Sequence, residues 1–331
     1  MSQVQHIAKN KKYLEMRSEL IRAIREFFWS EGFLEVETPL LLRLPGQEPY
    51  LSPMTLKIHN ERGEAFDAYL HTSPEYALKK MLAAGFEKIF FLGKVFRDHE
   101  SFDGTHNPEF TMIEWYRARE DFYAIMEDVE KLFQWISNRV AVSCRLTANS
   151  FERLHMRDVW QRYAGVNLDD YLEREKMLVL CEKKGHKPKV QEPYEDLFYR
   201  IFLNEIEPYL GKERPLILHH YPAPMAALSR LSPEDPRYAE RFEVYIGGLE
   251  LANCFSELTD PEEQLHRLEK DRSDRMSAGR DVFDIDMDFT QALKTMPPSA
   301  GIALGVDRLV MALMGCKNIN DVLSLPASIV F

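Results

Sequence analysis

Apolar and polar positions recur along the chain with two periods, which predict its helices and strands. Between residues 12 and 31, apolar side chains return every three or four positions with charged side chains between them, as in an amphipathic helix. Gly32 follows directly and is a common helix stop. An extended run over residues 33–38 comes next and is closed by Pro39. This part of the sequence therefore predicts a long helix followed by a strand.

Further elements follow from the same two periods. Residues 43–60 are rich in proline and are expected to be mostly loop, and residues 141–215 are a less distinctive mixture of helix and loop. The run DHESFDGTHN joins two strand-like segments and predicts a hairpin with a long loop. The expected strands cover residues 88–97, 109–117, 216–220, 241–246, 249–258 and 301–304, and the expected helices cover 75–84, 122–140 and 306–314. Consecutive antiparallel strands with helices between them indicate an α+β fold.

The composition describes an acidic globular protein. Its 331 residues can bury a large core, and the formal net charge of −11 provides no bulk attraction to nucleic acid, although a local basic patch is compatible with it. Cys144, Cys181, Cys254 and Cys316 lie far apart, so neither a zinc site nor a disulfide framework is expected. No apolar run is long enough to span a membrane, and the polar first residues do not form a secretion signal. We expect a cytoplasmic protein without membrane attachment.

The predicted hairpin carries the first candidate chemistry. Phe110, Met112, Glu114 and Tyr116 share one face of its second strand, because side chains alternate along a strand. A carboxylate among apolar neighbours is costly to bury without a partner. Two interpretations are open: Glu114 lies in solvent on a half-exposed strand, or it faces a ligand. Arg97 ends the first strand beside the same loop, and its guanidinium suits a carboxylate or a phosphate.

A second group of residues surrounds a predicted turn at Gly247–Gly248. A two-residue turn there would pair Glu243 with Ala252 and place Glu243 and Glu250 diagonally on one face. Two close carboxylates repel each other unless a cation lies between them. Mg²⁺ bound by such a pair together with substrate phosphates is a common arrangement. The alternative is two solvated glutamates on a strand.

Asn253, Phe255 and Glu257 alternate further along the same strand. In a straight strand they would face away from Glu250. Either they serve a different surface, or a bulge near Ala252 brings both sets into one site, since bulges are frequent beside active sites.

The segment GIALGVDRL places two glycines before a helix that has Arg308 in its first turn. It lacks the GK[ST] ending of a phosphate-binding P-loop. The glycines are compatible with the approach of a flat ligand, and Arg308 with a phosphate. A buried junction between a strand and a helix explains this segment equally well.

Together these segments resemble the three signature motifs of class II aminoacyl-tRNA synthetases, most closely those of the lysyl enzymes. The first motif, a helix and strand at a dimer interface, is similar to FLEVETPLL. The second is similar to FRDHESFDGTHNPEFTMIEWY and the third to GIALGVDRL, and FEVYIGGLELANCFSELTD resembles the lysyl-type strand before the third. The similarity implies one class II catalytic domain over residues 1–331, with an insertion at about 141–215, that forms a homodimer.

The resemblance implies a ligase that activates a lysine-type amino acid with ATP and Mg²⁺. In this family the substrate carboxylate attacks the α-phosphate in line, which gives an aminoacyl adenylate and pyrophosphate. Arg97 and Arg308 would be the catalytic residues, and Glu243 and Glu250 would hold Mg²⁺. The residues implied at the ATP site are Arg97, Glu100, His106, Asn107, Phe110, Glu243, Glu250 and Arg308.

The residues implied at the amino-acid site are Ser73, Glu75, Glu114, Tyr116, Asn253, Phe255, Glu257 and Ala303. A neutral or acidic amino acid would leave the carboxylates Glu75, Glu114 and Glu257 unpaired, and a buried unpaired charge is strongly destabilising. A substrate with two ammonium groups is therefore expected. Aspartyl-type relatives carry an Arg at the position of Glu257, which argues against an aspartate substrate.

The acceptor is expected to be a protein and not tRNA. No anticodon-binding domain is found before the first motif, as in the ligases that attach β-lysine to a lysine side chain of translation elongation factor P. Ser73 and Ala303 stand where lysyl-tRNA synthetases usually carry Ala and Gly, consistent with an amine on the β carbon of the substrate. Two alternatives are open: a lysyl-adenylate enzyme for tRNA, a carrier protein or a metabolite, and an inactive regulatory paralogue.

Overall fold

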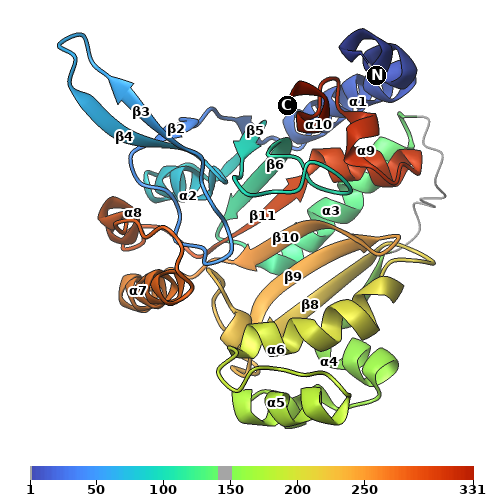
Figure 1. The fold of residues 1–331 in the computed structure, drawn as a ribbon, viewed down its shortest axis with the longest axis vertical. Helices are drawn as coiled ribbons and strands as arrows, with labels where there is room; N and C mark the ends of the chain where they lie inside the picture. The colour runs from blue at the N-terminus through green and yellow to red at the C-terminus, as the bar shows by residue number, and fades with distance from the viewer. Residues whose placement is uncertain (1, 141–150) are drawn as a thin grey trace.

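The computed structural model describes residues 2–140 and 151–331, and an eight-stranded mixed sheet forms its centre (Figure 1). In spatial order the strands are β1 (Leu34–Glu35), β5 (Lys88–Phe96), β6 (Glu109–Ala118), β11 (Ser299–Gly305), β10 (Leu249–Ser256), β9 (Tyr238–Ile246), β8 (Leu216–Pro222) and β7 (Glu152–His155). The inner strands pair antiparallel, whereas β1 and β7 pair parallel at the two edges. This confirms the predicted α+β architecture.

Helices cover both faces of this sheet. The main core lies under α1 (Gln3–Ser30), α3 (Phe122–Ser137) and α9 (Val306–Met314). Phe28 of α1 is fully buried there, and its ring centroid lies 5.0 Å from those of Phe33, Phe90 and Trp115. The opposite face carries α2 (Glu75–Ala83), α7 (Pro261–Ser277) and α8 (Met287–Ala292).

Helix α1 begins at Gln3 and not near residue 12, where the hydrophobic period predicted its start. A capping box fixes this end: the Ser2 hydroxyl accepts a hydrogen bond from the backbone N–H of Gln5, and the Gln5 side chain accepts one from the backbone N–H of Ser2. The first turns are mostly exposed, and the buried His6 places Nε2 3.1 Å from the carbonyl oxygen of Leu323. Few apolar residues mark these turns, so the periodicity could not locate them.

A small second sheet projects from the body (upper left in Figure 1). Its strands in spatial order are β2 (Leu41–Leu42), β4 (Ala65–Leu70) and β3 (Thr55–His59). The prediction of loop through residues 43–60 was therefore wrong over β3. Strands β3 and β4 are largely exposed, and Lys57 pairs with Asp67 across them at 2.8 Å. The residues of β3 (TLKIH) do alternate between polar and apolar, but the prolines and the glycine in residues 43–60 favoured a loop, and no buried face marks the strand.

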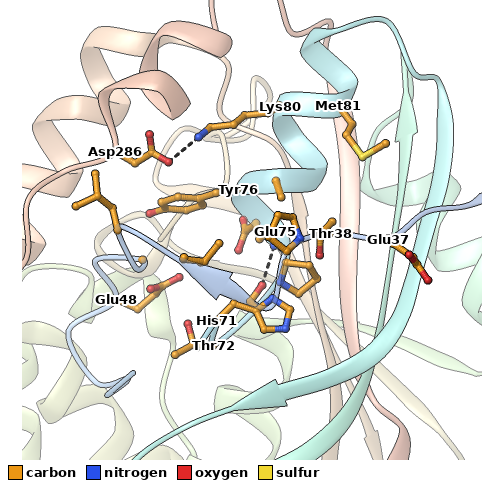
Figure 2. A pocket seen from close by; sticks show the side chains of 17 residues that line it. Glu37, Thr38, Glu48, His71, Thr72, Glu75, Tyr76, Lys80, Met81 and Asp286 are labelled. Atoms are coloured by element: carbon orange, nitrogen blue, oxygen red, sulfur yellow. Dashed lines mark hydrogen bonds and ion pairs between the residues drawn. The ribbon is translucent and has the colours of Figure 1, made fainter. Parts of the chain in front are cut away.

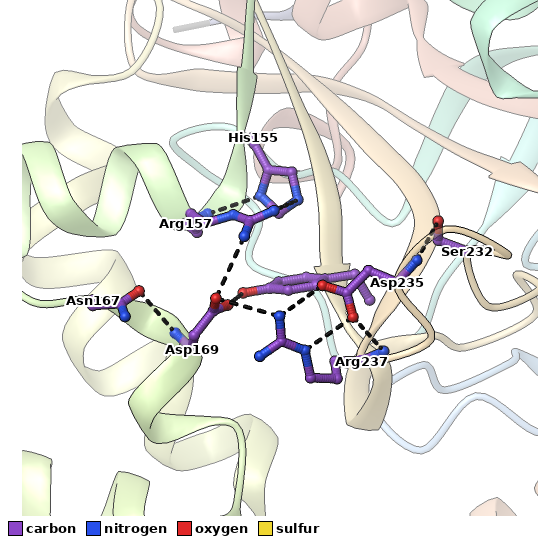
Figure 3. A network of polar contacts seen from close by, with 8 residues as sticks. His155, Arg157, Asn167, Asp169, Ser232, Asp235 and Arg237 are labelled. Carbon is purple, nitrogen blue, oxygen red and sulfur yellow. Dashed lines mark hydrogen bonds and ion pairs between the residues drawn. The ribbon is translucent and has the colours of Figure 1, made fainter.

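The less distinctive region at about 141–215 contains one strand of the main sheet, β7, which the sequence did not predict. It also contains the helices α4 (Met156–Val159), α5 (Arg174–Lys183) and α6 (Tyr194–Ile201). Asp169 ties this region to β9, because it accepts a hydrogen bond from the Tyr238 hydroxyl at 2.5 Å (Figure 3). Asp169 also pairs with Arg157 and Arg237, each at 3.4 Å.

Cys181, Cys254 and Cys316 are free thiols, and Cys144 lies outside the described residues. No helix within residues 2–140 and 151–331 has both the length and the apolar character needed to cross a bilayer.

Candidate active site

A β-bulge in β10 decides which side chains face the candidate site. The turn at Gly247–Gly248 forms as predicted, with both residues at positive φ. The predicted pairing of Glu243 with Ala252 is wrong, because the register shifts between Glu250 and Ala252 and Glu243 pairs with Asn253. An extra residue on one strand turns the side chains that follow it to the other face.

The bulge unites the two sets of polar residues that a straight strand would separate. Glu250, Asn253 and Phe255 line one cavity, on the face that carries Glu243. Ala252 is buried in the core on the opposite face. The predicted bulge near Ala252 thus exists and brings Asn253 and Phe255 to the cavity with Glu250, whereas Glu257 does not line it.

Two rows of side chains run across this face of the sheet. The first row is Glu114, Ala303, Asn253 and Glu243, and the second is Tyr116, Gly301, Phe255 and Arg241. A Cβ on Gly301 would lie 2.1 Å from the ring of Tyr116. Glycine at this position therefore lets the tyrosine ring lie flat across the neighbouring strand.

A cavity of about 990 Å³ lies over these rows. This is the size range of small-molecule sites. All the predicted site residues line it except Glu243 and Glu257, which are buried and contact Arg241 and Lys79 instead. The structure thus brings together side chains from α2, the β5–β6 hairpin, β10, β11 and α9.

Two arginines face one end of the cavity. The Nε of Arg97 is buried and has no hydrogen-bond partner among the described residues, and its guanidinium lies 5.0 Å from the ring centroid of Phe110. Arg308 donates to the carbonyl oxygen of Glu250 at 3.1 Å and to Nε2 of His106 at 3.0 Å. Burial lowers the pKa of Arg97 but leaves it a cation at neutral pH. A guanidinium with a buried and unpartnered N–H is suited to a carboxylate or a phosphate.

The loop between β5 and β6 surrounds these arginines. Burial, and then Arg308, lower the pKa of His106, so its ring is neutral and Nε2 accepts the hydrogen bond from Arg308. Glu100 lies 3.9 Å from the same nitrogen. The Asn107 amide donates to the carbonyl oxygen of Glu109 at 2.6 Å and accepts from the backbone N–H of Ala327 at 2.9 Å. Asn107 therefore holds the loop through contacts within the protein.

Glu243 and Glu250 are the candidate cation ligands. Both oxygens of Glu243 already accept hydrogen bonds, from Arg241 at 2.7 Å and from the Tyr245 hydroxyl at 2.6 Å. Burial and the neighbouring Glu243 raise the pKa of Glu250 to about 7. Glu207, which the sequence did not point out, has its pKa raised by burial and by Glu243 as well. This excess of negative charge fits a cation.

No group of three or more His, Cys, Asp or Glu side chains in residues 2–140 and 151–331 has the arrangement to hold a metal ion unaided. Mg²⁺ is usually held by one or two protein carboxylates together with substrate phosphates, and Glu243 and Glu250 are the candidate pair for such a site.

Carboxylates gather at the other end of the cavity. Glu114 is only 1% exposed, so the interpretation that placed it in solvent was wrong. Its two oxygens accept hydrogen bonds from the Ser73 hydroxyl at 2.6 Å and from the Tyr116 hydroxyl at 3.1 Å. Burial, and then Glu75, nevertheless raise the pKa of Glu114 to about 8. This carboxyl group is therefore poised to ionise when a cation arrives.

Lys79 is the residue that the sequence reasoning missed. Its ammonium lies 2.6 Å from Glu75 and 2.6 Å from Glu257. The spacing of Glu75 and Lys79 by one helical turn was visible in the sequence. Their common partner Glu257 lies far away in the chain, so its contact with Lys79 was not.

A second cavity of about 420 Å³ lies on the other side of α2 and is shown in Figure 2. It shares Glu48, Ser73, Glu75 and Tyr76 with the first cavity, so these residues form a common wall. Lys80 of α2 pairs with Asp286 at 2.6 Å beside it. The ion pair of Lys80 with Asp286 thus fixes helix α2, which carries the wall residues Glu75 and Tyr76.

Comparisons with known proteins agree with this geometry. The model of the family described as "tRNA synthetases class II (D, K and N)" matches residues 4–329. Proteins named elongation factor P–(R)-β-lysine ligase are similar over nearly their whole length. The one from Haemophilus influenzae strain PittGG is 40% identical over 315 residues, which are 95% of this chain and 94% of the relative. The one from Yersinia pestis strain Pestoides F is 39% identical over 318 residues, with 95% and 94% covered. The chain belongs to the family of class II tRNA synthetases (D, K and N).

Proposed function

We propose that this protein is an ATP-dependent ligase that activates (R)-β-lysine, or lysine, and transfers it to a lysine side chain of translation elongation factor P. One observation carries the activation step: the guanidinium groups of Arg97 and Arg308 line one end of a single cavity, and Glu75 and Glu114 line the other, with Glu257 buried next to them and joined to Glu75 through Lys79. This charge distribution is complementary to an amino acid with one carboxylate and two ammonium groups. The names of the similar proteins support the acceptor.

The activation step needs positioning and charge stabilisation. Arg97 holds the amino-acid carboxylate against the α-phosphate of ATP, and Phe110 stacks on the adenine. Attack by a carboxylate oxygen forms the bond to phosphorus and expels pyrophosphate. Arg308 binds the γ-phosphate and stabilises the negative charge that develops. Glu100 and His106 complete the ATP site beside Arg308, while Asn107 positions their loop.

Mg²⁺, held by Glu243 and Glu250 together with the phosphates, would supply positive charge to the leaving group. Arg241 and Tyr245 keep the Glu243 carboxylate in a fixed orientation for this contact. The raised pKa of Glu250 falls when a cation binds beside it, so Glu250 would be ionised in the loaded site.

The opposite end of the cavity selects the amino acid. Glu75 and Glu114 receive the ammonium group nearer to the substrate carboxylate. Tyr116, Asn253 and Glu257 receive the distal ammonium group, and Phe255 packs along the aliphatic chain. Ala303 lies between Glu114 and Asn253 in the first row of side chains, where its methyl group shapes the floor of the pocket.

In the transfer step, the neutral amine of the acceptor lysine attacks the carbonyl carbon of the adenylate. An amide bond forms, AMP leaves, and the amine loses a proton. The inactive paralogue is disfavoured because Arg97, Arg308, Glu243 and Glu250 are all present; Arg97, Arg308 and Glu250 line one cavity, and Glu243 is buried in contact with Arg241, which also lines it.

The proposed function is tested in two stages. ATP–pyrophosphate exchange is measured with lysine and with (R)-β-lysine, and transfer to purified elongation factor P is then followed by intact-protein mass spectrometry. Exchange with (R)-β-lysine and a modified acceptor are expected. No exchange with either amino acid would contradict the activation step. Exchange without transfer would assign the adenylate to another acceptor, such as tRNA or a carrier protein.

A pH dependence follows from the raised pKa of Glu114. Glu114 must be ionised to receive an ammonium group, so kcat/KM for the amino acid is expected to rise with pH up to about 8 and then level off. The Ser73 hydroxyl opposes this pKa rise by donating to Glu114. Ser73→Ala is therefore expected to move the acidic limb to higher pH, by about one unit.

The control for this experiment is Ser137→Ala, since the Ser137 hydroxyl donates to a helix carbonyl remote from the cavity. Its profile should coincide with that of the wild type. A Ser73→Ala profile that also coincides with the wild type would show that the Ser73 contact does not set the ionisation of Glu114.

The enzyme is further proposed to act as a cytoplasmic homodimer. In the first motif, Leu34, Leu40 and Leu41 are 53%, 42% and 40% exposed, and Trp29 at the end of α1 is 54% exposed. Large apolar side chains gathered on one surface are typical of an interface. Light scattering of the purified protein tests this assignment, and a monomer at micromolar concentration would contradict it.

A further inference from the structure

Lys79 supplies a buried positive charge inside the carboxylate end of the cavity. It lies on α2, one turn after Glu75, and its side chain is fully buried. Its ammonium lies 2.6 Å from Oε1 of Glu75 and 2.6 Å from Oε2 of Glu257, which follows β10. Burial opposes the charge on Lys79, but Glu257 and Glu75 together raise its pKa above the ordinary value. Lys79 is therefore a permanent cation in this site.

The ammonium of Lys79 does not satisfy Glu257 completely. Neither oxygen of Glu257 accepts a well-oriented hydrogen bond from the described residues, although Oε2 forms the ion pair with Lys79. Glu257 is 2% exposed, so water does not compensate for this. A buried carboxylate oxygen without a hydrogen-bond donor is unfavourable and calls for a further cation. Glu257 does not itself line the cavity, so its incompletely balanced charge acts on a bound substrate from behind the cavity wall.

A count of charges gives Lys79 a specific role. The carboxylate end contains Glu75, Glu114 and Glu257, and Lys79 balances one of these three charges. Two negative charges are left when all three carboxylates are ionised. An amino acid with two ammonium groups neutralises them, and its own carboxylate is met by Arg97. Without Lys79, the same substrate would leave one buried negative charge uncompensated.

We infer that Lys79 is a specificity-determining residue, which sets the pocket to a charge that accepts a substrate with two ammonium groups. This inference rests on the proposed function and deepens it. Lys79 acts through the carboxylates that it contacts and is a positioning residue, because its partner Glu75 lines the cavity and Lys79 does not. Its loss should impair recognition of the distal ammonium group and leave the ATP site, at the other end of the cavity, unchanged.

The first test compares two substrates that differ by one charge. ATP–pyrophosphate exchange is measured with lysine and with 2-aminohexanoic acid, which lacks the distal ammonium group, in the wild type, Lys79→Met and Lys79→Arg. In Lys79→Met, kcat/KM for lysine is expected to fall on the order of 10²-fold through KM. KM for ATP and kcat at saturating lysine should stay near the wild-type values, and the preference for lysine over 2-aminohexanoic acid should shrink. Lys79→Arg should retain most of that preference.

The second test uses the charge count directly. In Glu75→Gln, the carboxylates carry one negative charge that Lys79 does not balance, for two substrate ammonium groups. In Lys79→Met, all three carboxylate charges are unbalanced. The double variant Glu75→Gln/Lys79→Met again leaves two. Its kcat/KM for lysine is therefore expected to exceed that of Lys79→Met by about tenfold, whereas purely structural damage from the two changes would accumulate. Thermal unfolding of each variant checks that it is folded. If Lys79→Met does not fold, the double variant is compared with the wild type and Glu75→Gln instead.

The outcomes separate this inference from the proposed function. The role of Lys79 would be overturned, and the proposed function kept, by either of two results with an active wild type. One is an unchanged preference for lysine in Lys79→Met, and the other is a double variant with a lower kcat/KM than both single variants. A wild type that activates neither lysine nor (R)-β-lysine would overturn the proposed function, and this inference with it. Equal losses for both substrates in Lys79→Met and Lys79→Arg would reduce Lys79 to a structural residue.

Discussion

Replacing Arg97 with alanine is expected to slow amino-acid-dependent ATP–pyrophosphate exchange by about 10²–10³. The Arg97 guanidinium is preorganised at the cavity, with a buried Nε that has no partner among the described residues, and it lies over the ring of Phe110. Removing it deletes the positive charge closest to the proposed reacting atoms. Arg308 does not replace it, because Arg308 is engaged by His106 and by the backbone of Glu250. The exchange rate at saturating ATP and amino acid measures the effect.

The matched control is Arg22→Ala. Arg22 lies on α1 with its side chain 79% exposed, so its loss should leave exchange unchanged. Arg97→Lys keeps the charge but loses the planar two-pronged contact, and it should recover only part of the rate. If Arg97→Ala is folded by thermal unfolding and its rate stays within tenfold of the wild type, the proposed role of Arg97 in catalysis is wrong.

Replacing Phe28 with alanine should have the largest effect on stability, a loss of about 3–5 kcal/mol in the free energy of unfolding. The Phe28 ring is fully buried among Phe33, Phe90 and Trp115, and the helix and sheet that hold it cannot close the resulting space completely. Urea denaturation followed by tryptophan fluorescence measures the change.

The same substitution also tests how the two faces of β6 are divided. Trp115 faces the core beside Phe28, while Glu114 and Tyr116 on either side of it face the cavity. The folded Phe28→Ala variant should therefore keep the wild-type KM for the amino acid at low temperature. A KM that rises more than about fivefold would show that the core packing sets the pocket geometry. The control for the denaturation experiment is Tyr123→Ala, because the Tyr123 side chain is exposed and its loss should change the free energy of unfolding much less.

Local patterns in the sequence were enough to predict one strand of the site. The period of two along β6 placed Glu114 and Tyr116 on one face, and this holds in the structure because β6 is regular over its whole length. The β5–β6 hairpin and helix α9 were also predicted closely. In each case a regular run of apolar residues gives the period of the element, and in the hairpin the partner strand also lies nearby in the chain.

Features that depend on distant contacts or exposed backbone were not predictable in this way. The bulge near Ala252 was one of two open interpretations, the other being a separate surface, because period alone does not tell whether a strand gains a residue. Strand β7 contains four residues, and its only partner β8 lies about sixty residues away. The contact of Lys79 with Glu257 joins two segments that no local pattern relates.

The bulge in β10 also limits how this protein can be recombined with its relatives. Whether a residue of β10 faces the cavity or the core depends on how many positions separate it from the bulge. A chimera that exchanges β10 alone, or an alignment gap misplaced by one position, would exchange buried Leu251 or Cys254 with the polar side chains of the cavity. Engineers who wish to change the amino acid that this enzyme accepts should therefore transplant β9, its turn and β10 as one cassette.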